Sequence, residues 1–316
     1  MPHLISNHPA QLDELRAVLQ FIRTTRGFDA TGYCPSVLAA RIRGRLLAAG
    51  VASADEYVRR LVETPAEADL LVEALTIKVS HFFRDPLAFE YLRERVLPVL
   101  LARTTVVPGE PGLRVWSAGC AHGEEPYSLA ILLHELLQQN GSGLEPVLFA
   151  TDVDAPALAQ AQAAFYPAAS LANVRHGLMA AAFLPAGAGF RVRPEVAARV
   201  RFSVHDMLDP RSAAPAESVF GSFDLILCRN LLIYFQPDYQ AIICEKLFRA
   251  LAPGGFLMLG STENLPAPWS ARFRRVTDCC SLFQKPSRKA GFYADRRADS
   301  EQPPTEPSPP CLRRLA

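Results

Sequence analysis

The sequence predicts an α/β protein with a doubly wound, mostly parallel sheet of the Rossmann-like type, preceded by a small all-α domain. Strand-like and helix-like apolar segments alternate from about Phe82 onward. A strand near Val115 runs through a glycine-bearing turn into a long helix. Before Ser80 the apolar residues recur with helical spacing only. Repeated β-α alternation gives a parallel sheet with helices on both faces.

The N-terminal region, residues 1–80, is expected to form the all-α domain. Apolar residues at helical intervals predict helices over residues 12–26, 36–49, 53–62 and 66–75. Ser36 and Ser53 are suited to cap the second and third of these helices, and Gly50 ends the second.

Residues 81–286 are expected to form the α/β domain. Its predicted helices cover residues 86–103, 126–139, 155–164 and 237–251, and its predicted strands cover 113–118, 146–151, 223–227 and 255–260. Two short alternating runs around Pro194 predict a hairpin over Phe190–Phe202, a small antiparallel β insertion around residues 183–204. Residues 287–316 are rich in Pro, Ser and Arg, which predicts a disordered tail.

The turn after the first strand is acidic, which decides between ligands. Gly119 and Gly123 allow a sharp turn and a close approach of the backbone to a ligand. Glu124 and Glu125 follow without a neighbouring Lys or Arg, so a pyrophosphate would be repelled. Carboxylates accept hydrogen bonds from an amine or a ribose, so S-adenosylmethionine fits. The alternative is that both glutamates only stabilise the helix N-terminus electrostatically.

A second acidic position follows the next strand, in the run Ala150-Thr151-Asp152-Val153-Asp154. In a doubly wound sheet this position faces the ribose of a bound nucleoside. Asp152 lies 33 residues after Gly119, whereas dinucleotide folds place their acidic residue about 20 residues on. The spacing therefore argues against NAD. The alternative, that Asp154 caps the following helix, is compatible with a functional Asp152.

Polar residues also follow the strand Phe223–Leu227. Arg229 and Asn230 emerge at the carboxyl edge of the sheet, where loops host chemistry. Tyr234 follows, either as a phenol over the reacting centre or as a core aromatic in an apolar run.

Arg84 lies at the junction between the domains, where its guanidinium is suited to hold a carboxylate; an ordinary ion pair with Asp85 is the alternative.

Composition excludes several classes of protein. There are 33 Lys and Arg against 32 Asp and Glu, a net charge of +1, so no global field attracts nucleic acid. The seven cysteines lack metal-binding spacing, so no metal is expected, and reduced thiols are expected. No apolar run reaches the length of about 18 residues that membrane insertion requires. We expect a cytoplasmic protein and a monomer.

Five motifs, taken together and in order, resemble the chemotaxis-receptor glutamate O-methyltransferases, the CheR family. They are SHFFRD, WSAGCAHGEEPYS, ATDVD, CRNLLIYF and LAPGG, within residues 10–285. The resemblance implies an S-adenosylmethionine-dependent methyltransferase fold and S-adenosylhomocysteine as a product. It also implies methyl esterification of glutamate side chains on the acidic cytoplasmic helical bundles of methyl-accepting chemotaxis receptors.

The resemblance also assigns roles to residues. Arg84, Arg229 and Tyr234 are the catalytic candidates, with Tyr234 near the transferred methyl group and Arg229 helping to orient the reactants. The cofactor-binding candidates are Ser80 and Arg84 from the junction, Gly119 and Glu124 from the glycine turn, Asp152 at the ribose, Asp206 and Met207 beside the adenine, and Arg229 and Asn230 by the methionine part. The short loop around Pro185–Gly189 departs from relatives that bind a receptor's C-terminal tether peptide.

Receptor recognition is expected on the helix over residues 36–49, which holds three arginines and no acidic residue. Arg41 and Arg45 are four residues apart and share a face, so we expect them to dock on acidic receptor helices; a solvated charged face is the alternative.

Two alternative functions stay open. One is methyl transfer to a different protein or small molecule, and the other is a catalytically silent S-adenosylmethionine sensor.

Overall fold

The computed structural model describes residues 15–76, 78, 80–104, 112–218 and 222–287. They form two compact units: a helical unit that includes residues up to 79 together with 233–240, and an α/β unit that holds the remainder. The predicted tail from residue 288 onward and the first residues of the predicted helix 12–26 lie outside the described residues. Within these ranges, every helix is too short or too polar to cross a bilayer.

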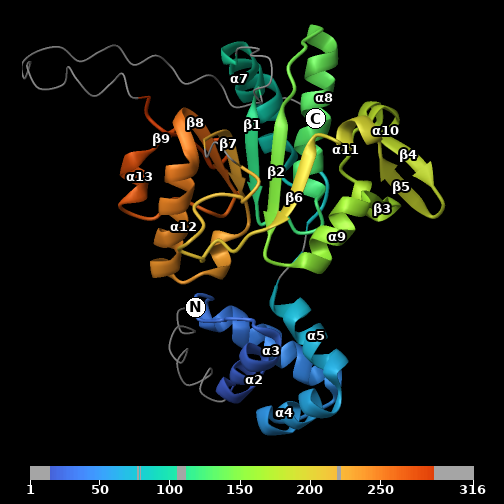
Figure 1. The fold of residues 1–316 in the computed structure, drawn as a ribbon, viewed down its shortest axis with the longest axis vertical. Coiled ribbons are helices and arrows are strands. Elements are labelled where there is room, and N and C mark those ends of the chain that lie inside the picture. The colour runs from blue at the N-terminus through green and yellow to red at the C-terminus, as the bar shows by residue number, and fades with distance from the viewer. Residues whose placement is uncertain (1–14, 77, 79, 105–111, 219–221, 288–316) are drawn as a thin grey trace, which may run out of the picture. The chain divides into compact units, whose positions relative to one another are not determined.

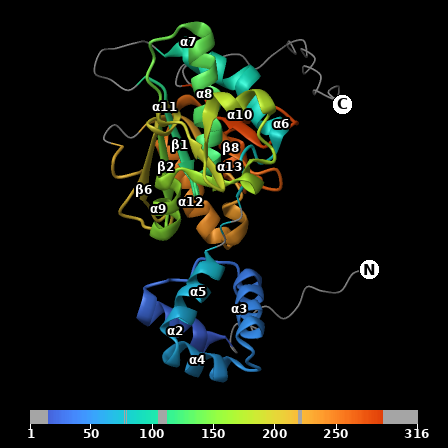
Figure 2. The same ribbon diagram turned by 90° about the vertical axis from the view of Figure 1, so that its right-hand side faces the viewer.

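Between residues 15 and 76, the described part of the helical unit has four helices around one apolar core. They are α2 (Arg16–Arg26), α3 (Pro35–Ala49), α4 (Ala54–Glu63) and α5 (Pro65–Leu75) (Figure 2). Val18, Ile22, Ile42, Tyr57 and Leu71 are completely buried between them. Ser53 caps α4 as predicted, since its side chain accepts the Glu56 N–H.

The prediction that Ser36 caps the next helix is wrong. Cys34 is the N-cap of α3 and Pro35 is its first residue, so Ser36 lies inside the helix. Pro35 takes this place because its fixed φ suits a first turn and its missing N–H has no partner to lose there.

The α/β unit is built on a seven-stranded sheet in the order β6-β2-β1-β7-β8-β10-β9 (Figure 1). The five parallel strands are β1 (Arg114–Ala118), β2 (Val147–Asp152), β6 (Val200–Val204), β7 (Phe223–Cys228) and β8 (Leu251–Leu259). The antiparallel edge is formed by β9 (Arg274–Arg275) and β10 (Leu282–Gln284). The predicted Rossmann-like, mostly parallel sheet is therefore present.

Helices flank this sheet (Figure 1). They are α6 (Pro86–Tyr91), the π-helical turn η1 (Leu92–Val96), α7 (Leu97–Arg103), α8 (Glu124–Asn140), α9 (Ala155–Ala163), α12 (Pro237–Ala250) and α13 (Trp269–Arg272). The chain steps one way from β1 through β2 to β6, then crosses back to β7 and steps the other way to β8. Since crossovers between parallel strands are right-handed, this reversal places helices on both faces.

A second, three-stranded antiparallel sheet is inserted between β2 and β6. It pairs β3 (Phe165–Pro167), β5 (Gly189–Val192) and β4 (Phe183–Ala186), with short helices η2 (Ala168–Leu171), α10 (His176–Ala182) and α11 (Pro194–Ala197). The predicted hairpin over Phe190–Phe202 is wrong. Pro194 begins α11 between its two halves, and Val200–Val204 pairs with β2 in the main sheet.

Candidate functional site

The predicted cofactor residues of the α/β unit gather at the carboxyl ends of the parallel strands. The strand order reverses between β1 and β7, and in doubly wound sheets such a switch point is where ligands bind. The turn after β1 holds the two glycines, and the turn after β7 holds Arg229 and Asn230. These two turns define the candidate site.

The turn after β1 is fixed by short hydrogen bonds to β2. The N–H groups of Gly119 and Cys120 both donate to the Thr151 carbonyl, at 2.8 and 2.9 Å. Gly123 has a φ of +91°, and a Cβ there would lie 2.9 Å from the Cβ of Ala161. Glycine is therefore required at position 123 on both conformational and steric grounds.

Asp152 lies at the end of β2, and its carboxylate connects this strand end to the turn after β1. One oxygen, Oδ2, accepts the Ala121 N–H at 2.9 Å, and the other, Oδ1, accepts the Asp154 N–H at 3.0 Å. Asp154 does cap α9, by accepting the Ala157 N–H, as the alternative interpretation required.

Glu124 is the first residue of α8 and its side chain is buried in the site. Its Oε2 atom has no hydrogen-bond partner among the described residues. Burial raises the pKa of this carboxyl, while the Ser80 hydroxyl, which hydrogen-bonds to it, lowers the pKa in part. A buried acceptor without a donor costs free energy, so this atom points to a ligand that supplies one.

Glu125, the next residue, is fully engaged. Its Oε1 accepts from Ser117 Oγ at 2.7 Å and its Oε2 accepts from Arg229 Nη1 at 3.2 Å. The sequence therefore places two adjacent glutamates whose surroundings differ: Glu125 binds the protein, and Glu124 retains an unmatched oxygen.

Arg229 lies at the centre of a buried electrostatic network, with its side chain 1% exposed. Beyond Glu125, its Nη2 donates to Asp85 Oδ2 at 2.8 Å and to the Arg84 carbonyl at 2.6 Å. The guanidinium carbon also lies 5.1 Å from the centre of the Phe89 ring. These contacts favour a positioning role; direct contact between the Arg229 side chain and the cofactor stays a prediction.

The junction before α6 is held against this network in a strained conformation. Phe83 and Asp85 both have positive φ, at 52° and 59°, which L-residues adopt at a cost. The Phe83 N–H donates to Ser128 Oγ at 2.9 Å, and Ser128 in turn donates to the Glu124 carbonyl at 2.6 Å. The junction that carries Ser80 and Arg84 is thus tied to the first turn of α8.

Asn230 follows Arg229 and also has a positive φ, of 57°. Its N–H donates to Glu263 Oε2 at 2.6 Å. Glu263 lies 33 residues after Asn230 and outside every sequence motif, so local patterns do not predict it. A buried acidic residue just after the neighbouring strand β8 was the available signal.

Asp206 and Met207 follow β6, beside the end of β2. Met207 is buried and Asp206 is exposed. The preceding residue, His205, donates its N–H to the Asp152 carbonyl at 3.0 Å. Lys246 of α12 holds this loop by donating from Nζ to the carbonyls of Asp206 and Asp209, at 3.1 and 3.0 Å. The predicted contact with adenine stays a prediction.

Tyr234 groups with the helical unit, although Arg229 and Asn230 belong to the α/β unit. Its carbonyl accepts the Cys34 N–H at 2.8 Å, and Phe235 forms an antiparallel bridge with Tyr33. Gln236 Nε2 reinforces this attachment by donating to the carbonyls of Thr31 and Tyr33, at 2.9 and 3.0 Å. The role of Tyr234 beside the methyl group stays a prediction.

Arg45 does not belong to an exposed docking face, which corrects the prediction for this residue. Its guanidinium binds the buried Glu67 through both carboxylate oxygens, the shortest contact being 2.7 Å. The Tyr57 hydroxyl donates to the same carboxylate at 2.6 Å. Position 45 faces α5 because α3 packs there, which periodicity alone did not reveal. Arg41 is exposed, as the prediction requires.

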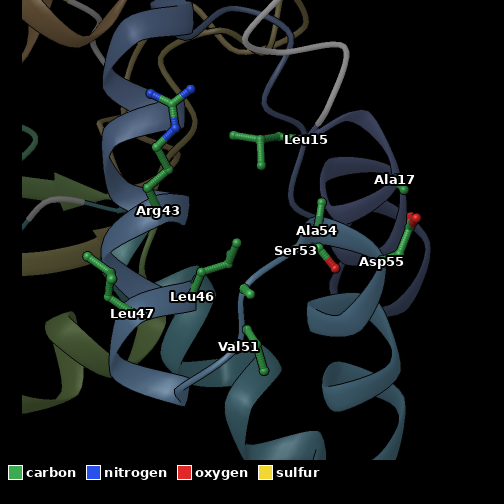
Figure 3. A pocket seen from close by; sticks show the side chains of 10 residues that line it. Leu15, Ala17, Arg43, Leu46, Leu47, Val51, Ser53, Ala54 and Asp55 are labelled. Carbon is green, nitrogen blue, oxygen red and sulfur yellow. The ribbon is translucent and has the colours of Figure 1, made fainter.

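A depression of about 830 Å³ lies in the helical unit, and its lining contains none of the predicted cofactor residues. Figure 3 shows Arg43, Leu46 and Leu47 of α3 on one side and the start of α4 on the other. Leu47 is 80% exposed. The lining residues are Leu15, Ala17, Arg43, Leu46, Leu47, Val51, Ala52, Ser53, Ala54 and Asp55.

The donor and acceptor pattern of the α/β site fits S-adenosylmethionine. The unmatched oxygen of Glu124 suits an ammonium or a hydroxyl donor, and the Asp152 carboxylate suits a ribose. The glycine turn allows the close approach that a nucleoside needs. The fold and this site define the class, an S-adenosylmethionine-dependent methyltransferase.

Comparison with known proteins then gives the family. Residues 78–278 match the SAM-binding domain of CheR methyltransferases, and residues 13–76 match the all-alpha domain of the same enzymes. The chain belongs to the CheR methyltransferase family, and S-adenosylmethionine is its cofactor.

Three relatives illustrate the range of the similarity. An uncharacterized 104.1 kDa protein of Rhodobacter capsulatus is 30% identical over 96% of this chain, which spans only 30% of that protein. Chemotaxis protein methyltransferase 1 of Pseudomonas aeruginosa is 31% identical over 78% of this chain and 89% of its own length. The probable biofilm formation methyltransferase WspC of the same species is 29% identical over 92% of this chain and 69% of its own length.

Proposed function

We propose that this protein transfers the methyl group of S-adenosylmethionine to glutamate side chains of chemoreceptors in the cytoplasm, forming glutamyl methyl esters. The observation that carries the proposal is the buried, unmatched Glu124 oxygen at the switch point of a CheR-family sheet, in the turn whose Ala121 N–H donates to Asp152. Relatives of comparable length that are named chemotaxis protein methyltransferases support the choice of acceptor.

The chemistry needs no general base. A glutamate side chain has a reference pKa of about 4.3, so the acceptor is ionised at neutral pH. The bound cofactor supplies an electrophilic methyl group on a sulfonium. The protein's task is to orient the acceptor oxygen in line with that methyl group and to exclude water from it.

The residues of the site are suited to hold the cofactor and to orient the acceptor. Glu124 and Asp152 bind the nucleoside and amino-acid parts through carboxylate oxygens. The network around Arg229 keeps the junction in place, so that Ser80 and Arg84 are presented from a fixed backbone. Arg84 is assigned to the cofactor carboxylate, and Tyr234 to the acceptor side.

The receptor would dock on the helical unit. Arg41 provides an exposed cation on α3, and Leu47 with the depression beside it provides apolar area. An amphipathic receptor helix with acidic residues matches both properties. Charge attraction would raise the encounter rate more than the final affinity.

The similarity to WspC favours one alternative, an acceptor in a signalling system other than chemotaxis. Cofactor binding would be the same, but the acceptor would differ. A catalytically silent sensor would bind the cofactor without transfer.

The experiment is methyl transfer from labelled S-adenosylmethionine to membranes that contain the chemoreceptors of the source organism. Base-labile label on a receptor is expected, and it should disappear when the acceptor glutamates are replaced by alanine. Base-stable label, or label on another protein, would contradict the proposed acceptor. Cofactor binding without any transfer would favour the sensor.

A further inference from the structure

The strand ends of β7 and β8 lie side by side and are joined by one buried carboxylate. Cys228 pairs with Leu259 at the end of the parallel register. Glu263 follows β8 and is only 3% exposed. Its Oε2 accepts two backbone N–H groups, that of Asn230 at 2.6 Å and that of Gly260 at 2.7 Å. The same atom therefore fixes the backbone just beyond both strands, at the second residue after β7 and the first residue after β8.

The turns that Glu263 joins have little room to rearrange. A Cβ at Gly260 would lie 2.7 Å from Glu263 Oε2 and 2.8 Å from Asn230 Nδ2. Asn230 itself is in the left-handed region, at a φ of 57°. Asparagine tolerates this conformation better than most residues, but it still needs surrounding contacts to persist.

We infer that Glu263 is a positioning residue of the cofactor site. By accepting the Asn230 N–H it holds the turn after β7 in its left-handed conformation, so that Asn230 is preorganised toward the ligand. Charge-assisted hydrogen bonds to backbone N–H groups are among the stronger ones. The inference rests on the proposed function insofar as Asn230 is taken to contact the cofactor.

The turn is restrained from two directions. The Arg229 side chain is fixed toward Asp85 and Glu125, while the Asn230 backbone is fixed toward Glu263. Glu263 also has a contact on its other side, since its carbonyl accepts from Ser281 Oγ at 2.9 Å. Ser281 is buried and does not touch Asn230 through this bond. Loss of the bond between Ser281 and the Glu263 carbonyl therefore weakens the packing around Glu263 but leaves the bond from the Asn230 N–H to the Glu263 side chain in place.

This arrangement supplies the test and its matched control. Glu263→Ala removes the acceptor for both N–H groups, Glu263→Gln keeps one side-chain carbonyl oxygen, and Ser281→Ala removes only the buried bond behind Glu263. For each variant we would measure thermal unfolding, S-adenosylhomocysteine affinity by calorimetry, and amide hydrogen exchange over residues 225–232 without any ligand.

Glu263→Ala is expected to weaken S-adenosylhomocysteine binding by about tenfold, because one charge-assisted bond to the turn is lost. It should also accelerate exchange of the Asn230 amide in the ligand-free protein. Glu263→Gln should fall between Glu263→Ala and the wild type. Ser281→Ala should lower the unfolding temperature while affinity and Asn230 exchange stay within twofold of wild type.

Two results would overturn the inference. One is wild-type affinity in both Glu263 variants, and the other is an equal loss of affinity in Ser281→Ala. If Glu263→Ala does not fold, Glu263→Gln decides by the same measurements. Failure of the wild type to bind S-adenosylhomocysteine would instead contradict the proposed function.

Discussion

The two turns that flank the switch point present groups of opposite charge and are restrained by different contacts. The turn after β1 is built from glycines, is fixed through its own backbone N–H groups, and ends in a glutamate with an unmatched buried oxygen. The turn after β7 carries Arg229 and Asn230, and the protein itself uses the guanidinium and the Asn230 N–H. Each turn retains one buried polar atom without a partner among the described residues, Glu124 Oε2 after β1 and Arg229 Nε after β7. The two turns differ in charge, since the unmatched atom after β1 is a carboxylate oxygen and the one after β7 belongs to a guanidinium whose terminal nitrogens already bind carboxylates.

Arg229→Met should give the largest effect, because it removes the cation from a buried network. Loss of one partner from a buried ion pair costs about 3–5 kcal/mol, and here two carboxylates lose their cation. We expect a lower free energy of unfolding, measured by urea denaturation.

A second substitution makes this test specific. Glu125→Gln added to Arg229→Met should recover part of the stability, because it removes one uncompensated buried carboxylate. A stable Arg229→Met protein that fails only to bind the cofactor would contradict the supporting role and restore Arg229 as a direct ligand.

The pH dependence of stability tests the side of the site near β6. Burial, followed by the Lys246 cation, lowers the pKa of His205 to about 4 from its ordinary value of 6.5. The unfolded chain then binds the proton more readily than the folded one, so stability falls as pH decreases from about 6.5 to about 4. The contribution is at most about 3 kcal/mol.

His205→Asn should flatten this slope, as measured by urea denaturation at a series of pH values. At pH 8 both proteins contain a neutral side chain, so that pH serves as the internal control. An unchanged slope in the variant would show that other groups carry the acid sensitivity.

Glu124→Gln should separate stability from binding. Burial raises the pKa of Glu124 in the folded protein, so the folded protein binds this proton more tightly than the unfolded chain does. The contribution of Glu124 to stability is therefore fully present below the unfolded-state pKa and is lost as pH rises through the folded-state pKa. At neutral pH the buried charge is a cost, and the amide should raise the unfolding temperature. S-adenosylmethionine affinity should fall about ten- to hundredfold, since a charged acceptor is lost.

Calorimetry and thermal unfolding check both parts of this prediction. Glu145→Gln, the same change at an exposed carboxylate, is the matched control and should alter neither quantity. Tight binding by Glu124→Gln would contradict the interpretation of the unmatched oxygen.

The arginines of α3 give the smallest expected effect. Arg41→Glu should raise the KM for the receptor several-fold at low salt and less at high salt, without changing cofactor affinity or stability. Arg45→Gln should instead lower the unfolding temperature, because the buried Glu67 carboxylate loses its cation and keeps only the Tyr57 hydroxyl as a partner. A KM effect of Arg45→Gln at unchanged stability would instead place Arg45 on the receptor-docking face.

Local sequence signals predicted most of the fold and part of the site. Gly119, Gly123 and Asp152 were predictable, because each follows a strand at a position whose geometry is set by the sheet. Glu263 was not, since its partner Asn230 is distant in sequence and only the parallel pairing of β7 with β8 brings them together. The roles of Arg45 and Arg229 depend on which neighbours pack against them, which periodicity does not contain. The strand Val200–Val204 was predicted as part of a hairpin but belongs to the main sheet. The prediction failed because apolar and polar residues alternate in the same way in an edge strand and in a hairpin strand.

We expect the cofactor to lie between the two turns and to supply the donor that Glu124 lacks. A crystal structure of the complex with S-adenosylhomocysteine tests it most directly. We predict a ligand hydroxyl or ammonium within about 3.2 Å of Glu124 Oε2, with the ribose at Asp152. A ligand bound elsewhere, with Glu124 Oε2 still buried and without a partner, would show that Glu124 is not a cofactor-binding residue.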